Sequence, residues 1–103
     1  MPDFPTVDTD PGVTRKVLAD HPDLMVVEFK FAEAGAEGKL HNHPHVQSTF
    51  VKSGKFLFSI NGTETEVVAG DSFVIPSNAT HGCVCIEQGE LIDCFTPRRD
   101  DFL

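Results

Sequence analysis

Three histidines and one glutamine in this 103-residue chain have the types and spacing of ligands to a single metal ion. His41, His43 and Gln47 occupy positions i, i+2 and i+6, which in an extended strand point to the same face. His81 follows a second strand-like segment and a proline turn. Imidazole nitrogens and an amide oxygen suit a divalent ion of intermediate softness. The pattern therefore predicts one divalent metal ion, Zn, Ni, Mn, Fe or Cu, bound by these four residues.

The first group of ligands lies in a segment that resembles the first motif of the cupin family. Residues 35–54 begin with a glycine and five further residues and continue with the His41-x-His43 pair. Six residues then separate Gln47 from Gly54, which ends the motif. Most cupins carry glutamate where this chain has Gln47. A neutral amide leaves the metal site one unit more positive, which favours Lewis-acid polarisation of substrate oxygens over redox chemistry.

Residues 70–85 resemble the second cupin motif, in which His81 is the ligand. Asn78 replaces a usual glycine, which is a mild change because asparagine tolerates a positive φ better than most residues. Cys85 stands where asparagine is common and shares the strand parity of His81. It is either a further metal ligand or a buried structural side chain. The two motifs in this order imply an all-β chain, a single-domain cupin jelly-roll β-barrel with the metal in its mouth.

A narrower resemblance lies in residues 41–47 and in the tail, residues 91–103. Both segments are similar to the single-domain pectin-degradation cupins of the KdgF type. That family opens the ring of 4,5-unsaturated monouronates to give a linear keto-sugar acid. The resemblance implies a metal-dependent enzyme for a small-molecule sugar acid from polyuronate breakdown, and it implies a homodimer. Whether the sugar acid comes from pectin, alginate or another polyuronate stays open.

Asp93 is a carboxylate in a strand whose two faces are otherwise apolar. It shares one face with Leu91 and Phe95, and a buried carboxylate usually has a partner or a chemical role. The alternative is an aspartate that is bonded to a turn or an arginine, or exposed at the barrel rim. The KdgF-type family has a catalytic Asp-x-Phe at this position. The resemblance thus implies that Asp93 is a general acid or base and that Phe95 packs against the sugar ring.

Two arginines in the tail, Arg98 and Arg99, are candidates for binding the carboxylate of a uronate. Arginine suits this role because it can donate two parallel hydrogen bonds to one carboxylate. We assign a catalytic role to Arg99 and substrate binding to Arg98, with Lys39 and Lys52 as the other cations near the motifs. The alternative for each arginine is a solvated pair with the aspartates that follow.

His45 lies between two predicted ligands and shares their strand parity. Pro44 can bend the chain and turn the His45 side chain away from the metal. We therefore expect His45 to bind substrate or support the ligands, with direct contact to the metal as the alternative.

The amino-acid composition limits which binding partners and which cell compartment we expect for the protein. The formal net charge of −8 disfavours nucleic acid and anionic membranes as partners. No apolar run approaches the roughly 18 residues of a membrane span, and the first residues lack the basic and apolar regions of a signal peptide. The cysteines are odd in number, Cys83, Cys85 and Cys94. We therefore expect reduced thiols and a cytoplasmic protein.

Short strands separated by polar turns must position these residues. Residues 1–12, rich in proline and aspartate, are interpreted as an arm that is mobile or laid on a partner subunit, and residues 13–103 as the barrel domain. The only helical expectation is one turn near residues 15–20. Asn61-Gly62 and Gln88-Gly89 predict hairpin turns. Alternating apolar residues predict strands over 27–31, 46–52, 56–60, 63–68, 73–75, 82–87 and 90–95.

Two other functions fit the same residues. Three histidines also suit an iron or copper cupin dioxygenase that acts on another small molecule, and such an enzyme would consume oxygen. A non-catalytic sugar-acid-binding cupin would bind a uronate without turnover. Oxygen consumption and turnover therefore separate the three hypotheses.

Overall fold

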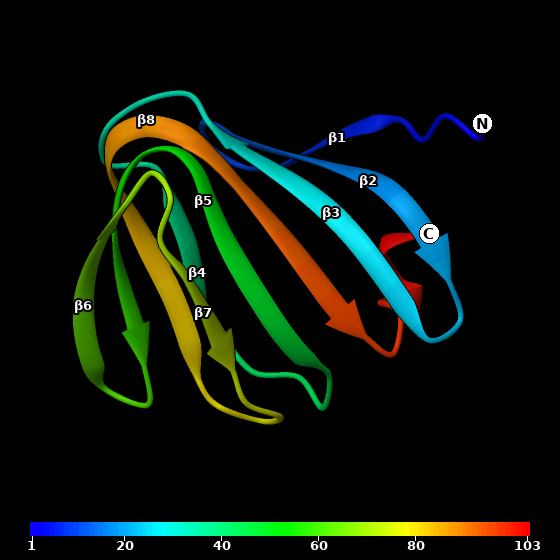
Figure 1. Ribbon diagram of the computed structural model, residues 1–103. Coiled ribbons are helices and arrows are strands. Elements are labelled where there is room, and N and C mark those ends of the chain that lie inside the picture. The colour runs from blue at the N-terminus through cyan, green and yellow to red at the C-terminus, as the bar shows by residue number, and fades with distance from the viewer.

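Eight antiparallel strands and one short 3-10 helix form the chain in the computed structural model, which describes residues 1–103. The sheet order is β1-β2-β3-β8-β5-β6, with β4 added beside β8 and β7 beside β5. The sheet curls on itself into a barrel (Figure 1). No helix has the length and apolar character needed to cross a membrane. The elements are β1 (Thr6–Asp10), β2 (Val13–His21), β3 (Leu24–Phe31), β4 (Glu37–His41), β5 (Val46–Ile60), β6 (Thr63–Val68), β7 (Ser72–Ile75), β8 (His81–Thr96) and η1 (Asp100–Phe102).

Two long strands, β5 with 15 residues and β8 with 16, connect the two layers of the barrel. They pair with each other along most of their length and bend together at one corner (Figure 1). At this corner a Cβ added to Gly54 would lie 2.5 Å from the Gln88 carbonyl oxygen and 2.7 Å from the Gly89 Cα. Side chains therefore do not fit where the two backbones meet, which is why glycine occupies the bend.

This corner corrects one prediction. Gln88-Gly89 is not a hairpin turn, because both residues lie inside β8 and residues 82–87 and 90–95 are two parts of one strand. The dipeptide has the chemistry of a turn, but the neighbouring bend of β5 uses it as a strand corner. The other predicted turn, Asn61-Gly62, is confirmed as the β5–β6 hairpin, with φ of 48° and 83°.

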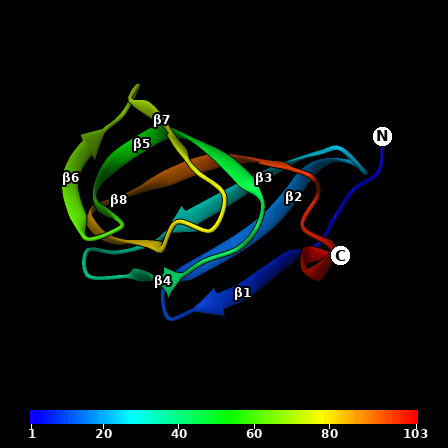
Figure 2. The same cartoon turned by 90° about the horizontal axis from the view of Figure 1, so that it is seen from below.

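The N-terminal region also differs from its prediction. Residues 15–20 belong to β2, not to a helical turn, and β2 pairs antiparallel with both β1 and β3. Part of the segment interpreted as an arm forms β1, which pairs antiparallel with β2 of the same chain. Figure 2 shows β1 and β2 on one side of the barrel, close to the C-terminal η1.

Apolar side chains from both layers fill the barrel interior in two clusters. The larger cluster includes Val51, Phe56, Ile75 and Leu91, and the smaller one surrounds Phe95 at the end nearer η1. In the larger cluster the rings of Phe31 and Phe56 pack edge to face. The predicted all-β barrel is therefore confirmed, and phenylalanine is its only aromatic hydrophobic residue, because the chain has no Trp or Tyr.

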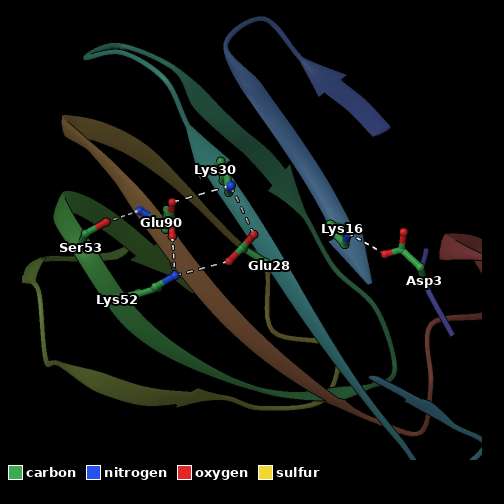
Figure 3. A network of polar contacts seen from close by, with 7 residues as sticks. All are labelled: Asp3, Lys16, Glu28, Lys30, Lys52, Ser53 and Glu90. Carbon is green, nitrogen blue, oxygen red and sulfur yellow. Dashed lines mark hydrogen bonds and ion pairs between the residues drawn. The ribbon is translucent and has the colours of Figure 1, made fainter. Parts of the chain in front are cut away.

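The outer face of β3, β8 and β5 carries a network of charges of both signs (Figure 3). The Lys52 ammonium lies 2.9 Å from a Glu90 carboxylate oxygen and 3.7 Å from one of Glu28, and Lys30 contacts the same two glutamates. Pairs of this kind on the surface each contribute about 0–1 kcal/mol to stability. Lys52, one of the cations considered for carboxylate binding, is thus engaged on the outside of the barrel.

Candidate metal centre and active site

The buried polar side chains of the chain lie together at one place in the barrel interior. An apolar interior makes such groups costly unless they are paired or bind a ligand. Hydrogen bonds and ring contacts connect them to one another, so the grouping marks the candidate functional site. The buried polar residues are His43, Gln47, Thr49, His81 and Asp93.

Three histidines converge from different segments of the chain. His41 ends β4 and is paired in register with His81, which begins β8. His43 lies in the loop between β4 and β5. The candidate ligand atoms of the three side chains all lie within 4.8 Å of one another. The histidines therefore form a compact cluster that could hold one metal ion.

The loop that carries His43 was expected to continue a strand from His41 to Gln47, but the chain leaves the sheet between β4 and β5. Its path is fixed by the turn before His81. The Asn78 backbone N–H donates to the His43 carbonyl at 2.8 Å, and Asn78 adopts the positive φ of 63° that its sequence position suggested. The Ser77 hydroxyl donates to the Pro44 carbonyl at 2.6 Å. These bonds, rather than strand periodicity, bring His43 to His41 and His81.

Each of the three imidazoles is oriented in the same way. Nδ1 lies close to a backbone carbonyl oxygen, at 2.7 Å for His41, 3.1 Å for His43 and 2.9 Å for His81. A proton on Nδ1 that is donated to this carbonyl leaves Nε2 as the nitrogen with a free lone pair. The backbone thus selects the tautomer that a metal ion requires.

Two contacts test whether the residues fit a metal ion. The His81 Nε2 atom is buried and has no hydrogen-bond partner, which is rare for a polar atom unless it binds a ligand. The His43 Nε2 atom lies 3.1 Å from the Gln47 Oε1 atom. When the Nδ1 proton of His43 is donated to the backbone, both of these atoms are acceptors, and a shared cation would satisfy them. The side chains therefore fit a bound divalent ion.

Burial also sets the charge of the imidazoles. It lowers the pKa of His81 to about 4, with the neighbouring histidines adding a smaller effect in the same direction. Burial likewise lowers the pKa of His43. Both side chains are thus neutral near pH 7, which is the form that binds metals.

A chain of hydrogen bonds connects the histidine cluster to Asp93. The Gln47 amide nitrogen donates to the Thr49 hydroxyl at 3.1 Å, and this hydroxyl donates to the Asp93 Oδ1 atom at 2.6 Å. Burial raises the pKa of Asp93 to about 7, against the opposing effects of Thr49, Gln47 and the Arg99 charge. Asp93 can therefore hold or release a proton near neutral pH.

A cavity of about 270 Å³ opens beside these groups. A hollow of about 900 Å³ near the β1–β2 turn is larger, but none of the buried polar residues line it, so it is not the site. The smaller cavity combines apolar walls with a few converging polar groups, as small-molecule sites do. Residues that line it include His41, Gln47, His81, Asp93, Phe95 and Arg99.

Comparisons with known proteins agree with this architecture. The Cupin domain family matches residues 27–93. A pectin degradation protein KdgF from Dickeya dadantii is 40% identical over 94 residues, which cover 89% of this chain and 84% of the relative. The chain belongs to the KdgF family of cupins. The resemblance inferred from the two motifs and the tail is therefore confirmed, and with it the jelly-roll β-barrel.

Two solved structures extend the likeness of this KdgF-family cupin to the whole fold. KdgF from Halomonas sp. is 38% identical with a TM-score of 0.91, and the match covers 100% of this chain and 99% of that one. An RmlC-like cupin from Shewanella frigidimarina is 39% identical with a TM-score of 0.91, over 97% and 89% of the two chains.

The tail of this KdgF-family cupin brings one of its two arginines to the cavity. The Arg99 guanidinium carbon lies 5.2 Å from the Phe95 ring centroid, and its nitrogens donate to Asp101 at 3.0 and 2.9 Å. Arg98 does not line the cavity and instead donates two hydrogen bonds, of 3.0 and 2.8 Å, to Asp20. Arg98 therefore hydrogen-bonds to Asp20 and not to the aspartates that follow it, whereas Arg99 forms the alternative pair with a following aspartate and also has a place in the cavity wall.

His45 and Cys85 are not among the residues that line the cavity. His45 is half-buried, and its Nε2 atom lies 3.0 Å from the Arg98 carbonyl oxygen, so it connects the ligand loop to the tail. The Cys85 thiol donates to the Glu87 carbonyl at 3.1 Å and is buried. Of the two interpretations of Cys85, the structural one describes its surroundings.

Three residues of the site were not anticipated from the sequence. Thr49 shares strand parity with Gln47, and that parity was the available signal. Arg15 and Phe102 line the cavity from β2 and η1. Arg15 has the same strand parity as the buried residues Val13 and Val17, which places its side chain on the inward face of β2. The prediction of a helical turn over these residues is the reason that it was not identified.

Proposed function

We propose that this cupin catalyses the metal-dependent linearisation of 4,5-unsaturated monouronates, small sugar acids from the breakdown of pectin or a related polyuronate. The observation that carries the proposal is the three-histidine cluster, two members of which, His41 and His81, line one cavity of about 270 Å³ together with Asp93. The pectin degradation named for its Dickeya relative supports the same substrate class.

The reaction adds water across an enol ether and then opens a ring. A proton adds to C4 of the C4=C5 bond, a hydroxyl adds to C5, and the resulting hemiketal opens to a ketone. A bound metal ion supplies a Lewis acid for substrate oxygens. Asp93 delivers and recovers the proton, which its pKa of about 7 allows at neutral pH. Phe95 packs against the sugar ring, and the charge of Arg99 favours an anionic substrate in the cavity.

We further propose that His41, His43, Gln47 and His81 are the ligands of the ion. The supporting observations are the unpartnered His81 Nε2 atom and the paired acceptors of His43 and Gln47. Zn, Ni, Mn, Fe and Cu all suit this set, and the metal available in the cell decides among them.

Removal of the metal is expected to abolish turnover and its return to restore it. The assay follows loss of the C=C ultraviolet band of 4,5-unsaturated galacturonate, with the spontaneous rate subtracted. Chelated protein should match the spontaneous rate, and protein reloaded with one of the five metals should exceed it. Turnover that persists in fully chelated protein would contradict the proposal. Oxygen uptake with another substrate would favour a dioxygenase, and uronate binding without turnover a binding protein.

We propose a homodimer formed through the outer face of β5 and β7. Phe50 and Val74, 45% and 59% exposed, place apolar side chains on this face. Light scattering after size-exclusion chromatography should give twice the chain mass for the natural protein and a monomer for Phe50→Lys. Val68→Lys, on the exposed surface of β6, is the matched control and should stay dimeric. A monomeric natural protein at assay concentrations would exclude the dimer.

The free thiols support a further proposal, a cytoplasmic location.

A further inference from the structure

The cavity contains three cationic side chains, and two of them already have carboxylate partners. Arg99 donates two hydrogen bonds to Asp101, at 3.0 and 2.9 Å. The Lys39 ammonium lies 3.6 Å from an Asp10 oxygen. Arg15 forms no hydrogen bond or ion pair through its side chain. Arg15 is therefore the cation in the cavity that makes no direct contact with a carboxylate, although the charge of Asp101, which is bonded to Arg99, acts on it from further away.

Aromatic packing holds the Arg15 guanidinium in place. Its central carbon lies 4.1 Å from the centroid of the Phe102 ring, and that of Arg99 lies 4.3 Å from the same centroid. The Phe102 ring is itself packed edge to face against Phe95 at 5.6 Å and Phe29 at 6.2 Å. A guanidinium that stacks on a ring keeps the N–H groups at its edge free to donate hydrogen bonds. Arg15 is thus half-buried and oriented with its donors unused.

The net negative charge of the molecule gives a role to an unpaired cation in the cavity. The chain has a formal net charge of −8, and Asp93 lies in the cavity. An anionic substrate is repelled by this field unless a local cation offsets it. Arg99 uses its Nε and Nη2 donors on Asp101, so two parallel bonds to a second carboxylate are not available from that edge. Arg15 can still donate two parallel hydrogen bonds to a carboxylate.

We propose that Arg15 is a specificity-determining residue that binds the carboxylate of the substrate, and that Arg99, held by Asp101, adds charge beside it. This inference rests on the proposed function for the identity of the substrate as a uronate. It assigns the selection of an acidic sugar over a neutral sugar to residues of β2 and η1, which lie side by side in Figures 1 and 2. It also gives Phe102 a positioning role, because the ring orients both guanidiniums.

The kinetic test compares 4,5-unsaturated galacturonate with its methyl ester, which has no negative charge. Arg15→Gln is expected to raise KM for the acid about 10- to 100-fold, the range for loss of a hydrogen bond to a charged group. For the ester, kcat/KM should stay within about twofold, so the preference for the acid disappears. Lys16→Gln is the matched control, because this neighbour in β2 pairs with the exposed Asp3 outside the cavity. Retention of the acid preference by Arg15→Gln would overturn the inference.

A binding test separates failure of this inference from failure of the proposed reaction. Calorimetry with galacturonate and with galactose needs no turnover. The natural protein should bind the acid more tightly than the neutral sugar, and Arg15→Gln should bind both alike. Arg99→Gln should keep part of the difference, whereas loss of the whole difference in Arg99→Gln alone would assign the carboxylate to Arg99 instead. Equal binding of both sugars by the natural protein would also overturn the proposal, whatever the reaction.

Discussion

Asp93→Asn is expected to lower kcat about 10²- to 10⁴-fold, the usual contribution of a positioned general acid or base. Asparagine keeps an oxygen that can accept the hydrogen bond from Thr49, which is 2.6 Å long in the natural protein, so the geometry of the site is preserved. It cannot exchange a proton with C4 of the substrate. The ultraviolet assay on the metal-loaded variant measures the effect, and full turnover would remove Asp93 from the mechanism.

The same substitution is expected to stabilise the fold of the metal-free protein. Burial raises the pKa of Asp93 from 3.8 to about 7, so the folded state holds a proton that the unfolded state releases between these values. The free energy of unfolding that depends on this group is therefore fully present below pH 3.8 and is lost as the pH rises to about 7. At 1.36 kcal/mol per pKa unit, the loss reaches at most about 4 kcal/mol.

Urea unfolding at pH 4 and pH 7 with a chelator present distinguishes removal of the Asp93 ionisation from better packing as the cause of the stabilisation. The gain for Asp93→Asn should be small at pH 4 and should grow to a few kcal/mol at pH 7. Asp8→Asn, an exposed aspartate in β1, is the matched control and should change little at either pH. An equal gain at both pH values would mean that the ionisation of Asp93 is not responsible. A variant with lower activity and higher stability is the expected result when function requires a buried ionisable group that destabilises the fold.

The predictable part of this molecule is the part in which neighbouring residues decide the outcome. Asn61-Gly62 forms a hairpin because both positions accept a positive φ, and the alternating residues of β3 and β5 form strands. Asp93 was identified because a carboxylate is unusual in an apolar strand. In each case the signal lies within a few residues of the feature that it predicts.

The features that the sequence did not reveal depend on contacts between distant segments. Gln88-Gly89 became a strand corner because β5 bends beside it at Gly54. Thr49 became a partner of Asp93 only when β5 and β8 paired, with these two residues opposite each other. Phe102 came to stack on Arg15 only when η1 packed beside β2, 87 positions along the chain. Local patterns contain no information about such pairings, whereas strand register determines them.

His81→Ala is expected to abolish metal-dependent turnover and to weaken metal binding more than about 100-fold, the upper range for loss of a group that only supports a ligand. The Nε2 atom that this change removes is buried and has no other partner, and the ring lies 4.3 Å from that of His41, between centroids. Calorimetric titration with the metal that restores activity measures the affinity. His21→Ala, an exposed histidine far along the chain from the ligands, should behave like the natural protein. Normal metal affinity in His81→Ala would exclude His81 as a ligand.

The pH dependence of stability gives a second result for His81 that does not require the metal. Its folded-state pKa is about 4, below the ordinary value of 6.5, so the unfolded state binds the proton first as the pH falls. Stability from the neutral imidazole is therefore present above pH 6.5 and is lost as the pH falls towards 4, by at most about 3 kcal/mol. Metal-free His81→Ala should lack this part of the acid destabilisation, which urea unfolding at pH 7 and pH 5 would reveal. An unchanged difference between the two pH values would mean that His81 is not held neutral by burial. A histidine that binds a metal must also be neutral. The burial that lowers the stability of the metal-free protein in acid therefore also keeps His81 in the form that binds the ion.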